Sequence, residues 1–113
     1  MHELSIVASI IDSVARDAGE RGIKKILRLR IVVGELSAVN RGALSFALEN
    51  TTAGTILEGA GIEIFVREAR EICENCRREF KPQPPFYQCP ECDASVFPGA
   101  ESRQIYIDFY EGD

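Results

Sequence analysis

Four cysteines grouped in two pairs constrain the fold of this chain more than any other feature of its sequence. The pairs read CENC and CPEC, and 12 residues lie between them. Two residues between cysteines let both sulfur atoms of a tight turn point inward, and two such turns facing each other supply the tetrahedral four-sulfur site that zinc prefers. The spacing therefore predicts a zinc site with these ligands: Cys73, Cys76, Cys89 and Cys92.

Four thiolates fill the coordination sphere of zinc, so the predicted site has no open position for water and is structural rather than catalytic. The insert that contains it, of about 20 residues, is too short to bury a core of its own and depends on the metal. Two alternatives stay open: cysteines that are reduced or disulfide-bonded without metal, and a thioredoxin-like redox pair. The redox alternative is disfavoured because neither pair opens a helix after a core strand.

The amino terminus carries the chain's single histidine, His2, followed directly by Glu3. The terminal amine, the backbone nitrogens, the imidazole and the carboxylate are all available there to one metal ion. Adjacent nitrogens form small chelate rings with near-planar donors, and square-planar coordination is typical of Ni(II) or Cu(II). On residue chemistry alone, a nickel site and an inert terminal histidine both remain open interpretations.

Hydrophobic periodicity predicts two helices and three strands. Apolar residues recur at intervals of three and four over 4–18 and again over 41–53, as on the buried face of a helix. Apolar and polar residues alternate over 26–33, 62–69 and 103–110, which is typical of half-buried strands. In the first strand, the residues expected to share one face are Leu27, Leu29, Ile31 and Val33.

The order of these elements predicts an α+β fold. A strand–helix–strand unit crosses over right-handedly and gives a parallel pair of strands. The last strand returns after the cysteine insert and is expected to pair antiparallel with 62–69, which completes a mixed three-stranded sheet with both helices on one face. We expect one domain formed by 1–70 plus 102–113, and a small zinc-ribbon-like lobe formed by 71–101.

Charge and length limit the partners and the compartment that we expect. The chain has 113 residues, a formal net charge of −5 and a pI near 4.9. Nucleic acids and anionic membranes both favour a basic surface, so neither is an expected partner. No stretch approaches the roughly 20 continuous apolar residues that span a bilayer, and the first residues lack the basic region of a signal peptide. We therefore expect a cytoplasmic protein.

Four stretches of the sequence together resemble the HypA/HybF family of hydrogenase-maturation nickel metallochaperones. They are MHELSIV at the start, GELSAV after the first predicted strand, AGTILEGAGIEI before the second, and the two CxxC pairs followed by a last alternating strand. The resemblance covers essentially the whole chain in the same order. The terminal MHE together with two CxxC pairs is highly specific, whereas either motif alone is much less so.

The resemblance implies that His2 binds nickel through its imidazole, that the backbone nitrogens of His2 and Glu3 share the site, and that Glu3 also helps to place the ion. It implies transferable Ni(II) as the cargo and structural Zn(II) on the four cysteines. The implied function is delivery of nickel to the large-subunit precursor of nickel–iron hydrogenase, with a GTPase accessory protein of the HypB type as partner. Urease stays open as a second recipient. No catalysis is implied, and we expect a monomer or a weak homodimer.

Asn40 departs from the family pattern, since many relatives carry an acidic residue near the nickel site at this position. Asparagine can cap the second predicted helix, but it is a poor nickel ligand. Glu35 and Glu49 are candidate replacements for that carboxylate, although an ordinary surface acid is the favoured interpretation of both.

Two rival functions are less consistent with the sequence. A zinc-ribbon protein-interaction module without nickel transfer explains the cysteines, but it leaves the terminal MHE unexplained. Its nucleic-acid-binding version also conflicts with the acidic charge. An enzyme is disfavoured because the chain has one histidine, no open zinc position, and neither a Gly-rich phosphate loop nor a nucleophile–base pair.

Overall fold

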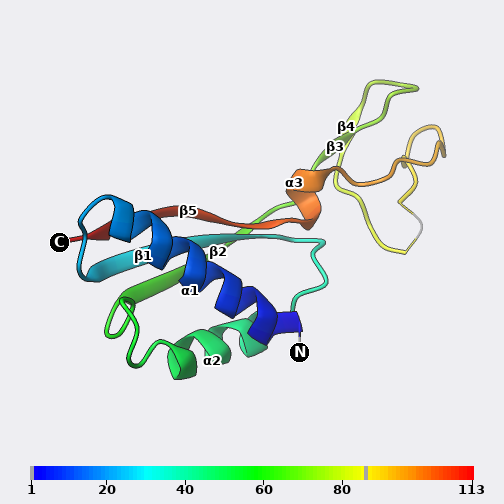
Figure 1. Cartoon of the computed structure of the whole chain (residues 1–113). Coiled ribbons are helices and arrows are strands. Elements are labelled where there is room, and N and C mark those ends of the chain that lie inside the picture. The colour runs from blue at the N-terminus through cyan, green and yellow to red at the C-terminus, as the bar shows by residue number, and fades with distance from the viewer. Residues whose placement is uncertain (1, 86) are drawn as a thin grey trace. The chain divides into compact units, whose positions relative to one another are not determined.

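The computed structural model describes residues 2–85 and 87–113, with the backbone alone for His2. Figure 1 shows the elements, and the described helices and strands are α1 His2–Glu20, β1 Ile26–Gly34, α2 Arg41–Thr51, β2 Gly61–Arg67, β3 Glu71–Ile72, β4 Glu79–Phe80, α3 Ala100–Arg103 and β5 Ile105–Gly112. The two long helices and the three long strands confirm the predicted elements. Hydrophobic periodicity did not reveal β3, β4 and α3, which are two to four residues long.

One face of α1 is buried along the length of the helix. Val7, Ile10, Val14 and Ala18 recur at intervals of three or four residues, and each is at most 7% exposed. The helix ends shortly before Gly22, whose φ of 73° lies in the left-handed region that glycine adopts at little cost. The helix therefore forms where the 3.6-residue period of the sequence predicts it.

The three long strands form a sheet in the order β2-β1-β5. The strands β1 and β2 are parallel, since Ile26 N–H donates to Ile56 at one end and Glu35 N–H donates to Arg67 at the other. The strands β1 and β5 are antiparallel, since Gly34 N–H donates to the carbonyl of Gln104 at one end and Asp113 N–H donates to the carbonyl of Lys25 at the other. The sheet is therefore mixed, as predicted.

The predicted neighbour of the last strand was wrong, because β5 pairs with β1 and not with β2. The residues Ile31, Val32 and Val33 are all at most 4% exposed, so this part of β1 is buried on both faces. A continuous apolar run of this kind is typical of a strand inside a sheet rather than at its edge. Leu27, which was expected to share the core face, is 45% exposed.

Both long helices cover the same face of the sheet. The hydroxyl of Tyr110 on β5 donates to the carboxylate of Asp17 on α1, which fastens the end of that helix to one edge strand. At the other edge strand, Leu48 of α2 and Ile62 and Ile64 of β2 line one groove. The central strand β1 consequently lies beneath both helices, where its apolar run meets their apolar faces.

The chain separates into two compact units. Unit 1 comprises 1–32, 39–65 and 106–113, and unit 2 comprises 33–38 and 66–105. All four cysteines belong to unit 2, whereas both long helices belong to unit 1. Over the part of the chain that the structure describes, no helix is both long and apolar enough to cross a membrane.

Candidate metal centre

Two turns of the same construction carry the four cysteines. In the first turn, Arg77 N–H donates to the carbonyl of Cys73 at 2.7 Å, and in the second, Asp93 N–H donates to the carbonyl of Cys89 at 2.9 Å. Arg77 and Asp93 each follow the second cysteine of their pair, and their φ angles of 65° and 62° lie in the left-handed region. The CxxC spacing therefore produces the same closed turn twice.

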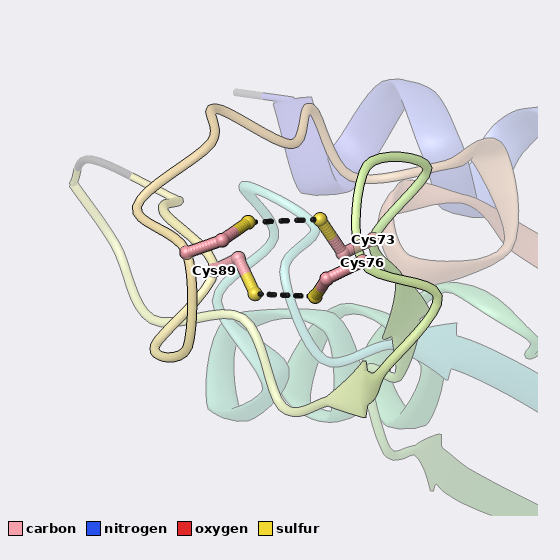
Figure 2. A group of neighbouring side chains, drawn as sticks. Cys73, Cys76 and Cys89 are labelled. Carbon is pink, nitrogen blue, oxygen red and sulfur yellow. Dashed lines mark hydrogen bonds between the residues drawn. The ribbon is translucent and has the colours of Figure 1, made fainter.

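The sulfur atoms of the two turns face one another, as Figure 2 shows for the labelled cysteines. The Sγ atoms of Cys73 and Cys92 are 3.6 Å apart, as are those of Cys76 and Cys89, and all four Sγ atoms lie within 4.8 Å of one another. Tetrahedral zinc with bonds of about 2.3 Å separates its ligands by about 3.8 Å. A disulfide needs about 2.05 Å, and all four cysteines are free. The donor set thus fits a tetrahedral metal such as zinc.

The cluster around the sulfur atoms is small. Cys73 and Cys89 are fully buried and pack with Phe80, and Ala94 and Val96 complete the cluster from partly buried positions. Two of the three buried side chains are cysteines of the candidate metal site, so Phe80 is the one large apolar side chain buried in this cluster.

The four thiols lie in unequal environments. Asn75 Nδ2 donates to Cys92 Sγ at 3.4 Å, and this contact, with the Ala94 N–H, lowers the pKa of Cys92 to about 7. The Arg78 N–H lowers the pKa of Cys76, but desolvation and the neighbouring thiols outweigh it and raise that pKa to about 11. A bound divalent cation favours the thiolate at every ligand.

Two carboxylates that sequence reasoning did not assign to this unit hold its loops in place. Glu71 accepts hydrogen bonds from Gly99 N–H at 2.9 Å and from the hydroxyl of buried Ser102 at 3.0 Å. Glu35 accepts from Ala69 N–H at 2.8 Å and pairs with the ammonium of Lys81 at 3.0 Å. Glu35 thus connects backbone segments within unit 2. Its position in the sequence, two residues after a predicted strand, gives no sign of these partners.

The amino-terminal candidates lie at the start of α1. His2 is its first residue, and both Met1 and the imidazole of His2 lie outside the described residues. The carboxylate of Glu3 accepts a hydrogen bond from Asn40 N–H at 3.1 Å. Asn40 Oδ1 accepts from Ala43 N–H at 2.9 Å, which confirms the predicted cap of α2. The structure therefore brings Glu3 next to Asn40, the residue that caps α2.

Comparison with known proteins identifies the family. A family model described as "Hydrogenase/urease nickel incorporation, metallochaperone, hypA" matches residues 1–112. The chain belongs to this family. Its curated relatives include the hydrogenase maturation factors HypA of Moorella thermoacetica, 37% identical with all of both chains covered, and of Chlorobium limicola, 35% identical with the same coverage. HypA proteins are metallochaperones and not enzymes.

Solved structures share the fold of this HypA-family chain. A solution structure of the nickel metallochaperone HypA from Helicobacter pylori has a TM-score of 0.71 at 23% identity, and covers 97% of this chain and 96% of its own. A second solution structure of a HypA protein has a TM-score of 0.73 at 24% identity, and covers 99% and 96%. The α+β fold of this chain is therefore shared with solved HypA proteins.

Proposed function

We propose that this HypA-family protein binds Ni(II) at its amino terminus and delivers the ion during maturation of nickel–iron hydrogenase. The family match over residues 1–112 carries this proposal, since it extends through the terminal His2 and Glu3. The large-subunit precursor of the hydrogenase is the recipient, and a GTPase accessory protein of the HypB type is the partner. The family description also includes urease, which makes urease a second recipient to test.

The chemistry of the terminus supports a transferable site. The imidazole of His2 and the main-chain nitrogens of His2 and Glu3 form adjacent chelate rings around one ion, a donor set that suits square-planar Ni(II). Such ligands must lose protons before they bind, so nickel affinity falls as the pH decreases. A site made by the end of a chain opens readily, as delivery requires.

The four cysteines have a different role in this proposal. Zinc on four thiolates has no open position, so it holds the cysteine turns together and is not the cargo. In this proposal, residues 1–70 plus 102–113 form the nickel-binding domain, and residues 71–101 form the zinc-binding domain. The net charge of −5 supports a protein that does not bind nucleic acid. We also infer that nickel delivery by this protein takes place in the cytoplasm.

Nickel titration of zinc-loaded protein that begins at Met1 tests the proposal. The wild-type protein is expected to bind one Ni(II) per chain, and His2→Ala is expected to lose this binding while its zinc content stays the same. Equal nickel affinity of the two proteins would reject the carrier function. The recipient is tested separately, by measuring nickel transfer from the loaded protein to a hydrogenase large-subunit precursor and to apo-urease.

A further inference from the structure

The first turns of α1 and α2 are joined by a hydrogen bond that involves Glu3. The backbone N–H of Asn40 donates to Glu3 Oε2 at 3.1 Å, and both residues belong to unit 1. Glu3 directly follows His2 in the chain, so this contact acts on the turn that carries the nickel-binding residues of the proposed function. Its carboxylate therefore has a partner in the protein before any metal is considered.

The local structure around Asn40 presents its backbone, and not its side chain, to Glu3. Asn40 Oδ1 accepts from Ala43 N–H at 2.9 Å and so closes the first turn of α2. Gly42 leaves room for this arrangement, because a Cβ at that position would lie 3.3 Å from Asn40 Oδ1. The amide side chain is thus engaged within its own helix, while the N–H of the same residue points to the start of α1.

The electrostatics of the contact favour a carboxylate at this place. The amino-terminal end of a helix carries a partial positive charge, and Glu3 lies in the first turn of α1 while it accepts a hydrogen bond at the start of α2. The partial positive charges of both helix ends therefore stabilise a negatively charged acceptor at this place. A nickel ion that approached Glu3 Oε2 would have to compete with the Asn40 N–H for that oxygen atom.

We propose that the Glu3 carboxylate is a positioning group, which fastens the nickel-binding turn of α1 to the N–H of Asn40 and does not coordinate the ion. The inference deepens the proposed nickel carrier and rests on it. The contact with Asn40 uses the side chain of Glu3, whereas the proposed function assigns its backbone nitrogen to nickel. Loss of the carboxylate leaves the donor atoms of nickel unchanged, but it removes the contact that holds those donors in place and so accelerates release of the ion.

The first experiment measures nickel release from the zinc-loaded, full-length protein into an excess of chelator by stopped-flow absorbance. Glu3→Ala is expected to release nickel about fivefold to tenfold faster than wild type, the range expected for the loss of one hydrogen bond of ordinary net strength. Its nickel absorption spectrum is expected to match that of the wild-type protein. Glu3→Gln, which keeps an oxygen acceptor, is expected to restore part of the slow rate.

Glu58→Ala is the matched control. Glu58 Oε1 accepts from Gly54 N–H at 2.7 Å, so it makes the same kind of carboxylate–backbone contact in the same unit, after α2. Its removal is expected to leave nickel release at the wild-type rate. An effect as large as that of Glu3→Ala would overturn the inference, because general loosening of unit 1 would then explain both.

The donor side of the hydrogen bond is tested by Asn40→Pro. The φ of Asn40 is −80°, which proline tolerates, and proline removes the N–H. Asn40→Ala removes only the capping side chain, so the difference in release rate between the two variants isolates the N–H. In the double variant with Glu3→Ala, the proline substitution is expected to have little further effect, because both changes remove the same contact.

The outcomes are distinct. A changed nickel spectrum in Glu3→Ala would show that the carboxylate is a ligand, and a wild-type release rate in that variant would show that the contact has no role; either result overturns the inference. If Asn40→Pro does not fold, as judged by circular dichroism, the Glu3 variants still decide the question. Undiminished nickel binding by His2→Ala would instead reject the proposed function itself.

Discussion

Removal of the metal from the four-cysteine site is expected to unfold the segment around it and to leave unit 1 folded. The buried cluster in this segment consists of Cys73, Phe80 and Cys89. Burial of one large apolar side chain contributes about 1.5–3 kcal/mol, and Phe80 is the one such residue of the three. Structural zinc contributes roughly 10–16 kcal/mol in small peptides near neutral pH. Loss of the metal therefore removes far more free energy than this cluster supplies.

Amide hydrogen exchange measured by NMR can locate this unfolding. Cys73 N–H donates to the carbonyl of Arg78 at 3.0 Å, and Cys89 N–H donates to the carbonyl of Ala94 at 2.9 Å. Both amides are expected to lose protection after chelation and to regain it when zinc is restored. The Leu44 amide of α2 is the internal control and is expected to stay protected. Retained protection at both cysteine amides in the metal-free protein would refute the reasoning.

Four further predictions concern the amino terminus, the stability of each unit and the pKa of one carboxylate. Residues fused ahead of Met1 are expected to reduce nickel loading at unchanged zinc content, measured by metal analysis after nickel loading, because they remove the free amine and crowd the chelate. Gly34→Ala is expected to lower the free energy of unfolding by about 1–3 kcal/mol, because its Cβ would lie 2.5 Å from a backbone oxygen. Gly19→Ala is expected to raise the free energy of unfolding by about 0.5–1 kcal/mol, because a Cβ at this helical position meets no atom within 4 Å. Urea unfolding measures the change in both variants. Tyr110→Phe is expected to raise the pKa of Asp17 towards its ordinary value, measured by NMR titration, since the tyrosine hydrogen bond holds that pKa low. The pKa shift stabilises the native state above about pH 4, and this contribution is lost as the pH falls through the lowered pKa.

The elements and the cysteine site were predictable because they depend on local patterns. The helical period of α1 and the alternation in β2 and β5 identify a buried face without any knowledge of the partner element. Each CxxC turn is closed by a hydrogen bond from the residue after its second cysteine, Arg77 or Asp93, to the first cysteine. The turns therefore depend on local sequence, and the spacing of the cysteines predicts that the four sulfur atoms converge.

The strand order and the partners of the carboxylates were not predictable in the same way. A returning strand can join either edge of a parallel pair, and burial of Ile31, Val32 and Val33 on both faces of β1 decides in favour of β1. Glu35 and Glu71 bind backbone N–H groups of loops whose paths no periodicity describes. Such contacts depend on tertiary structure, which becomes known only when the chain is folded.

X-ray absorption spectroscopy at the nickel edge tests the central claim most directly, on zinc-loaded protein that begins at Met1. The account predicts nickel bound by nitrogen and oxygen donors, including one imidazole, with no sulfur in the coordination sphere. It also predicts that His2→Ala loses the imidazole contribution. Sulfur ligands on nickel, with the spectrum unaffected by His2→Ala, would contradict the account and place the ion on the cysteines.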